Sequence, residues 1–187
     1  MKTFGCVGNT IRLRSGHYLD LANPQPCQFD LTDIAGALSK ICRFGGQCTM
    51  FYSVAEHSYR CAVQGRVDGA SIGAQAAILL HDAAEAFIGD IVKPLKIMLP
   101  EYSVIEDRME TAIAEKFECS FTKHRYIITE IDRAMLIAER RSLFSADNVE
   151  WTGESEVREL GKMEFACWDP YTAERKFMHH AALLGIA

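Results

Sequence analysis

One apolar stretch, residues 73–88, constrains the fold of this chain more than any other feature. Its titratable residues are His81, Asp82 and Glu85, and the rest is almost entirely apolar. A helix that is apolar on every side is normally buried, and an ionised carboxylate is costly to bury without a partner. No Lys or Arg stands between Asp68 and Glu85 to supply one. A divalent cation held by several helices would resolve this conflict.

Helical geometry predicts that these three side chains lie together. At about 100° per residue they fall at about 0°, 100° and 40°, so one imidazole and two carboxylates share one arc. Two residues on other predicted helices would add a nitrogen and an oxygen. Two nitrogens and two oxygens suit Mn, Fe, Co, Ni or Zn, and Mg is also open. The predicted ligands of this one divalent ion are His57, His81, Asp82 and Asp132.

Apolar periodicity and end signals predict an all-α chain with a small N-terminal β-hairpin. The hairpin is expected between Ile11 and Leu21, around Ser15-Gly16. Ser53 and Glu56 fit a capping box at the start of the second helix. The polar, acidic segment 145–165 is expected to be a loop or lid. Helices are expected over residues 31–41, from 53 onward, 73–88, 102–117, 123–144 and 170–184, the last capped by Asp169.

Composition narrows the class of protein. With 187 residues and 49% hydrophobic content, the chain can bury a sizeable core and is expected to form one domain over residues 1–187. The net charge of -5 argues against nucleic acid or an anionic membrane as a partner, since both bind dense Lys and Arg. Its 7 cysteines form no C-x-x-C pair, and the sequence contains no signal peptide and no long apolar run. We therefore expect a soluble, cytoplasmic protein with reduced thiols.

The same residues carry a resemblance to a known family. His57, the adjacent His81-Asp82 and the later Asp132 reproduce the H…HD…D pattern of the HD phosphohydrolase superfamily. The segment HDAAEAFIGDIVKPLK is similar to the signature of the small YfbR-like 5′-deoxynucleotidases and the related phage deoxynucleoside triphosphohydrolases. RFGGQ, YSVAEHS and WDPYTAERKFM also resemble these short proteins. The resemblance covers nearly the whole chain, its HD-x-x-E-x-x-x-x-D core is specific, and it implies a single HD-domain helical bundle.

The resemblance implies roles for individual residues. The four positions of the pattern imply metal ligands, and Arg43 matches a phosphate-contacting arginine. Glu85 and Asp90 match acidic residues that position the water or shuttle protons. These roles are chemically coherent, because a bound ion lowers the pKa of its water and polarises a phosphoryl oxygen. Glu85, about one helical turn from His81, could then accept or donate a proton.

Further substrate-binding residues are predicted from charge and shape. Lys93 and Lys96 follow the acidic motif on a loop marked by Pro94, where they could neutralise phosphate in a protein of net negative charge. Phe44 and Pro94 could bracket a base. Plainer roles are open for some of these residues, because lysines after a helix usually lie on a solvated surface. Arg43 could instead cap a helix C-terminus.

Two departures from the family pattern limit what can be carried over from the resemblance. Gln47 stands where a histidine is expected after RFGG, and glutamine cannot titrate near neutrality. Between Asp82 and Asp132 the only further histidine is His124, whereas dinuclear HD proteins use an additional pair. One metal is therefore favoured over two, and these missing ligands also count against a di-iron HD oxygenase.

The predicted function is metal-dependent hydrolysis of a small-molecule nucleotide. The expected substrate is a deoxynucleoside mono- or triphosphate, such as dATP, cut at the 5′ oxygen of the sugar. A phosphodiesterase or pyrophosphatase with the same metal site remains open, as does a nucleotide-binding HD module without turnover. Glu85 and Asp90 favour turnover, because binding alone needs no proton-transfer group, although Glu85 could simply pair with an arginine. Since relatives commonly self-associate, a homo-oligomer is also expected.

Overall fold

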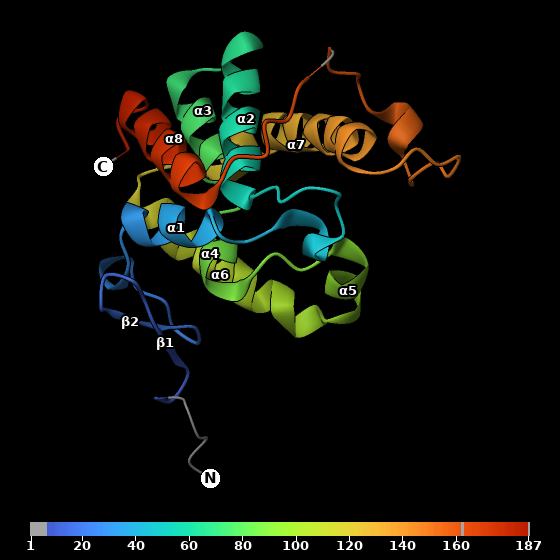
Figure 1. Ribbon diagram of the computed structural model, residues 1–187. Helices are drawn as coiled ribbons and strands as arrows, with labels where there is room; N and C mark the ends of the chain where they lie inside the picture. Colours follow the sequence, from blue (N-terminus) through green and yellow to red (C-terminus); the bar gives the residue numbers. More distant parts are fainter. Residues whose placement is uncertain (1–6, 162, 187) are drawn as a thin grey trace.

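The chain forms an all-α fold with a small antiparallel hairpin near the N-terminus, as the sequence predicts (Figure 1). The structure is a computed structural model that describes residues 7–161 and 163–186. No described helix is both long enough and apolar enough to cross a bilayer. The helices are α1 Leu31–Leu38, α2 Val54–Val67, α3 Ile72–Leu79, α4 Glu85–Ile88, α5 Lys93–Met98, α6 Pro100–Lys116, α7 Phe121–Leu143 and α8 Pro170–Leu183, with 3-10 helices η1 Pro26–Gln28, η2 Arg43–Gly46 and η3 Glu154–Glu156.

The N-terminal hairpin lies where alternation predicts it. Strand β1, Thr10–Arg12, pairs antiparallel with β2, Tyr18–Asp20, and places Ile11 opposite Leu19. The turn closes with a hydrogen bond of 2.8 Å from the Leu13 N–H to the His17 carbonyl. Leu19 is fully buried in the main hydrophobic core, so the hairpin is tied to the helices by its inward face.

Helix α2 lies at the centre of the bundle and contacts α3, α7 and α8 (Figure 1). Gly65 is the point of closest approach. A Cβ built on it would lie 2.7 Å from Cδ1 of Ile78 on α3 and 3.5 Å from Cδ1 of Ile131 on α7. A larger residue at Gly65 would force the Ile78 side chain to shift, so the three helices pack closely at this level. Their largest fully buried side chains include Ile78, Leu79 and Ile131.

The predicted helix over residues 73–88 is wrong at its centre. Helix α3 ends at Leu79, α4 begins at Glu85, and residues 80–84 form a turn that carries the His-Asp pair. The backbone there bonds with a three-residue spacing, from the Ala83 N–H to the Leu80 carbonyl at 2.9 Å, for example. The expectation that His81, Asp82 and Glu85 share one face of a continuous helix is therefore wrong.

A side chain replaces the helical hydrogen bond at this break. In a continuous α-helix the Ile78 carbonyl would accept from the Asp82 N–H, four residues on. Here Nδ1 of His81 lies 2.7 Å from that carbonyl oxygen. The imidazole thus takes the acceptor that would have extended the helix, and the chain turns. Apolar periodicity contains no signal for such a competition.

The start of α2 confirms only half of the predicted capping box. The Ser53 hydroxyl accepts a hydrogen bond of 3.1 Å from the Glu56 N–H, as expected of an N-cap. The Glu56 carboxylate does not bond back to Ser53. It binds Arg60 at 2.6 Å and accepts a hydrogen bond of 2.7 Å from the Trp168 N–H. Glu56 therefore ties the segment before α8 to α2, which a reading of local sequence cannot show.

The remaining difference is helix α5, whereas segment 145–165 has little regular structure, as expected of a loop. Lys93, Pro94 and Lys96 belong to helix α5 and not to a loop, because a proline in the first turn of a helix loses no hydrogen bond. Segment 145–165 contains the short η3 and no other helix or strand in its described part. Arg140 on α7 binds Asp147 at 2.7 Å and also pairs with Glu154, so this segment is pinned to α7.

Candidate metal centre

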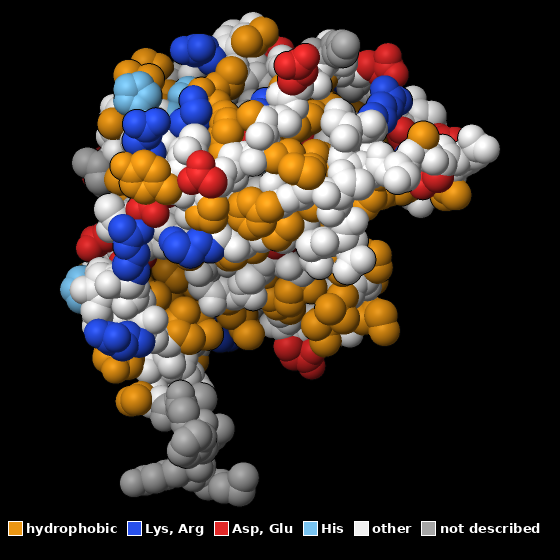
Figure 2. All heavy atoms as spheres, viewed as in Figure 1, with side chains coloured by type: hydrophobic (Ala, Val, Ile, Leu, Met, Phe, Trp, Pro, Cys, Tyr) orange, Lys and Arg blue, Asp and Glu red, His pale blue; other side chains and the backbone are white. Residues whose placement is uncertain are grey.

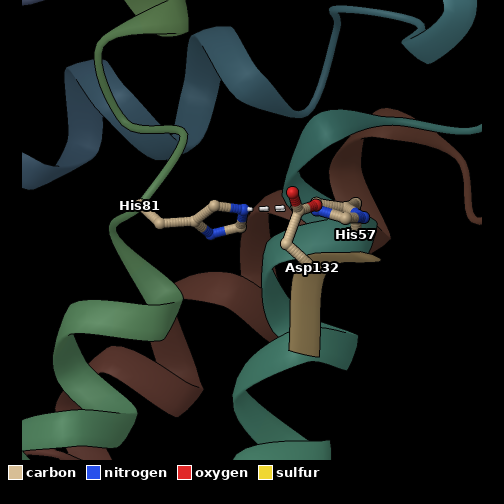
Figure 3. Close-up of side chains that lie close together, drawn as sticks. All are labelled: His57, His81 and Asp132. Carbon is tan, nitrogen blue, oxygen red and sulfur yellow. Dashed lines mark hydrogen bonds and ion pairs between the residues drawn. The ribbon is translucent and has the colours of Figure 1, made fainter. Parts of the chain in front are cut away.

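Three predicted ligands meet at one point from three different elements (Figure 3). Nε2 of His57, on α2, lies 3.4 Å from Nε2 of His81, in the turn after α3. Oδ1 of Asp132, on α7, lies 3.3 Å from the former and 3.8 Å from the latter. All three ligand atoms lie within 4.8 Å of one another, so this group can hold a metal ion.

The fourth predicted ligand, Asp82, borders the same atoms. Its Oδ1 lies 3.2 Å from Nε2 of His81, and its Oδ2 lies 3.5 Å from Nε2 of His57. Oδ2 is also 3.3 Å from Nη1 of Arg43. The Asp82 carboxylate therefore faces both the histidine pair and a buried guanidinium group.

The hydrogen bonds at Nδ1 of His57 and His81 leave Nε2 of each ring free to bind a cation. Nδ1 of His57 lies 2.6 Å from Oε1 of Glu139, and Nδ1 of His81 lies 2.7 Å from the Ile78 carbonyl. Both partners are acceptors, so each neutral ring carries its proton on Nδ1 and presents a lone pair on Nε2. Metal-binding histidines typically have this arrangement. Two imidazole nitrogens beside carboxylate oxygens form a suitable site for a borderline divalent ion.

Opposite charges in the cluster shift the pKa values of its histidines and carboxylates in opposite directions, each toward the charged form. Burial acts to lower the pKa of His81, but Asp82 and Asp132 outweigh it, and the pKa is raised. Burial acts to raise the pKa of Asp132, but the two histidines hold it well below its usual range. Protons on the imidazoles and a metal ion therefore compete for the same negative charge, so metal affinity falls as the pH falls.

Glu85, the first residue of α4, is a buried carboxyl group beside this cluster. Its exposed fraction is 6%, and its Oε2 has no hydrogen-bond partner in the described part of the chain. Burial, together with the charges of Asp82 and Asp90, raises its pKa well above the ordinary value. The pKa of half-buried Asp90 is raised as well, by burial and by Asp82. Glu85 therefore keeps its proton at a pH where a free glutamic acid has lost it.

Arg43 joins the site from η2 and does not cap a helix. It is buried, with Nη1 3.3 Å from Oδ2 of Asp82 and Nε 3.3 Å from Oε2 of Glu139. The next three residues have left-handed backbone, with φ of 59° at Phe44, 59° at Gly45 and 75° at Gly46. Glycine adopts this conformation freely, whereas Phe44 holds it at a cost of about 1–2 kcal/mol.

The other predicted substrate-binding residues lie on two different elements, Phe44 on η2 and the rest on α5. The half-buried Phe44 ring packs edge-on against Phe144, at 5.0 Å between centroids. Lys96 binds Glu106 at 2.7 Å. That carboxylate, followed by the charge of Glu85, raises the pKa of Lys96 against the effect of burial. Lys96 thus lies within electrostatic reach of the site.

Lys93 and Pro94 are exposed, and neither forms a side-chain contact with the cluster among the described residues. Exposed apolar side chains surround them on α5 and the start of α6, including Ile97 and Met98, each 75% exposed. Figure 2 shows hydrophobic side chains gathered over this part of the surface. The role of Phe44 and Pro94 in bracketing a base stays a prediction.

Glu139 belongs to the site, although no sequence motif selects it. It is fully buried, and its Oε1 accepts hydrogen bonds from the Tyr52 hydroxyl at 2.9 Å and from Nδ1 of His57 at 2.6 Å. Burial acts to raise its pKa, but Arg43 and His57 outweigh it and lower the pKa. A signal was present in the sequence, because Glu139 follows Asp132 by two helical turns and shares its face of α7.

No model of a known protein family matches the chain. Two proteins described as uncharacterized are similar to it. Over 124 residues the chain is 38% identical to YfdR of Escherichia coli, and this covers 65% of each protein. Over 111 residues it is 37% identical to RCAP_rcc00048 of Rhodobacter capsulatus, covering 57% of each. The similarity thus spans less than two thirds of either relative.

Proposed function

We propose that this chain is a metal-dependent phosphohydrolase of the HD type that releases phosphate or triphosphate from the 5′ position of a deoxynucleotide. The observation that supports it most is the histidine pair. Their Nε2 atoms lie 3.4 Å apart, and each Nδ1 is engaged by an acceptor on the far side of its ring. A buried carboxyl group and a buried guanidinium group stand beside this pair, as phosphoryl transfer to water requires.

The metal would be held by four residues, and its identity is open among Mn, Fe, Co, Ni, Zn and Mg. When bound, such an ion supplies a water of near-neutral pKa and polarises a phosphoryl oxygen. The proposed ligands are His57, His81, Asp82 and Asp132.

Glu85 is the proposed proton donor. Its raised pKa favours the protonated form, which could deliver a proton to the sugar 5′ oxygen as the P–O bond breaks. Glu85 is then a carboxylate and must regain a proton. Asp90 is close enough to raise the pKa of Glu85 and is less buried, so we assign it to proton exchange between Glu85 and solvent.

Arg43 is the proposed phosphate-binding residue. A chain of net charge -5 repels a polyanion, so local positive charge must offset that repulsion. The Arg43 guanidinium lies against Asp82 and so is adjacent to the metal ligands. Lys96, which is held by Glu106, adds a second cation at the edge of the same acidic group.

The decisive experiment measures products from a panel of deoxynucleoside mono- and triphosphates with Mn²⁺, Co²⁺, Zn²⁺ and Mg²⁺. Ion-exchange chromatography separates inorganic phosphate, triphosphate and pyrophosphate, so it distinguishes the proposed activity from a pyrophosphatase. Asp132→Asn protein is the control for contaminating enzymes. Metal analysis accompanies each assay. Protein that is loaded with metal and releases no product from any substrate would instead be a binding module.

A further inference from the structure

One carboxylate, Glu139, connects the metal side of the site to its phosphate side. Its Oε1 lies 2.6 Å from Nδ1 of His57, a proposed metal ligand. Its Oε2 lies 3.3 Å from Nε of Arg43, the proposed phosphate-binding residue. His57 comes from α2 and Arg43 from η2, so Glu139 on α7 joins two segments that carry different tasks.

We propose that Glu139 is a positioning residue that couples metal binding to phosphate binding. It fixes the His57 ring with Nε2 toward the metal ligands, and it holds Arg43 in place beside Asp82. The metal part of this inference depends only on the geometry of the cluster. The phosphate part rests on the proposed function.

The first half of the coupling concerns the His57 tautomer. An ionised carboxylate can only accept, so the proton of the His57–Glu139 hydrogen bond belongs to Nδ1. The Tyr52 hydroxyl also donates to Oε1, at 2.9 Å, and makes no hydrogen bond with the other oxygen, Oε2, in the described chain. Because all three side chains are buried, water cannot replace either bond without disturbing the core. Glu139 thus keeps the Nε2 lone pair available to a metal ion.

The second half concerns the balance of charge around Arg43. Among the described residues, the buried guanidinium pairs with two carboxylates, Glu139 and Asp82. If Glu139 loses its charge, Asp82 becomes the remaining partner, although it is also a proposed metal ligand. Arg43 would then compete with the metal for Asp82. Neutralising Glu139 should therefore weaken binding of both the cation and the anion.

The test uses the purified full chain with two binding probes, Mn²⁺ and inorganic phosphate. Free Mn²⁺ is measured by electron paramagnetic resonance, and phosphate bound beside Mn²⁺ is measured by broadening of its ³¹P resonance. Neither measurement requires turnover. If the wild-type protein binds Mn²⁺ but hydrolyses nothing, the proposed function fails while the metal part of this inference is still tested.

Glu139→Gln keeps the shape of the side chain and removes its charge. We expect its Kd for Mn²⁺ to rise by about 10–100-fold, the usual effect of removing a partner of a metal-bound histidine. Its Kd for phosphate, measured at saturating Mn²⁺, should rise as well. Tyr52→Phe is the matched control, because it removes one donor from Oε1 and leaves the contacts with His57 and Arg43 in place. It should lower stability by about 1 kcal/mol and leave both Kd values near wild type.

A purely structural role for Glu139 predicts a different pattern. The melting temperature of Glu139→Gln would fall, but folded protein would bind Mn²⁺ and phosphate as the wild type does, and this would overturn the proposal. A loss confined to one of the two probes would overturn the coupling. If Glu139→Gln folds too poorly to titrate, Glu139→Asp replaces it. Asp keeps the charge but is one methylene shorter, so we expect Kd values for Mn²⁺ and phosphate between those of the wild type and those expected for Glu139→Gln. Wild-type Kd values for this variant would contradict the proposal.

Discussion

The proposed metal side of the candidate site and its proposed substrate side are built differently. The metal side draws His57 and Asp132 from the long helices α2 and α7, and fixed acceptors hold both imidazoles. The substrate side consists of the short elements η2 and α5, with left-handed backbone at Phe44 and wide exposure at Ile97. Ligand geometry must be exact to tenths of an ångström for a metal, whereas a substrate tolerates looser contacts. Under the proposed function, we therefore expect that substrate preference can change without disturbing the proposed metal ligands.

The largest effect is expected when one of the proposed metal ligands is substituted. Asp132→Asn is expected to weaken Mn²⁺ binding by more than about 100-fold, beyond the effect of a residue that only supports a ligand, and to reduce hydrolysis to background. The fold should survive, because the Asp132 side chain is 40% exposed. Metal analysis after dialysis and a thermal melt without metal provide the measurements. Full metal content in this variant would remove Asp132 from the ligand set.

Glu85→Gln tests whether Glu85 acts in proton transfer and not in metal binding. We expect kcat to fall by about 10²–10⁴-fold while metal content stays near wild type, because Glu85 is assigned to proton transfer. The acid form is the active one, so wild-type kcat should decline as the pH rises through the raised pKa of Glu85. The variant should lose that decline. A residual kcat above about a tenth of wild type, well short of the loss expected for acid catalysis, would contradict the assignment.

On the substrate side, Arg43→Ala should lower kcat/KM by about 10–150-fold, the loss of one charge-assisted hydrogen bond. Arg43→Lys should recover only part, since lysine lacks the planar fork of donors. Phe44→Ala provides the contrast. If the Phe44 ring touches the base, this variant should have a lower kcat/KM for deoxynucleotides and an unchanged kcat/KM for p-nitrophenyl phosphate. Equal losses on both substrates would instead assign Phe44 to packing against Phe144.

The smallest expected difference lies within α5. Lys96→Ala should raise KM modestly, by about two- to fivefold, as for the loss of a partly screened charge. Lys93→Ala, a matched change three residues earlier in the same helix, should leave KM unchanged because its side chain is exposed. Initial rates for both variants at low ionic strength measure the difference. A larger effect at Lys93 would mean that α5 moves against the site when substrate binds.

The sequence predicts the long helices well, because their apolar periodicity continues over several turns, as in α7. Their ends also follow local chemistry, as at Asp169, which accepts from the Thr172 N–H at 3.1 Å. The break after Leu79 could not be predicted, because it depends on an imidazole taking a backbone carbonyl. Helix α5 was missed because Pro94 indicates a loop unless the helix start is known.

The candidate site also contains residues that the sequence predicts and one that it does not. The four proposed ligands carry a sequence pattern, and the structure brings their side chains together. Glu139 carries no such pattern, since it precedes Arg140 and Arg141 and so resembles a residue of a charged outer face. Its importance comes from tertiary contacts with Tyr52 and Arg43, which lie far away in the sequence. Spacing along a helix can suggest such a residue only after the neighbouring ligand is known.

Gly65 lies where α2 packs against two residues that adjoin the candidate ligands, about two helical turns from His57 along α2. The missing side chain lets α2 approach Ile78, whose carbonyl accepts from His81, and Ile131, which immediately precedes Asp132. A methyl group at Gly65 would force Cδ1 of Ile78 to shift and would only touch Cδ1 of Ile131. The residue that supplies the carbonyl bonded to His81 is therefore also the one whose side chain a substitution at Gly65 would disturb.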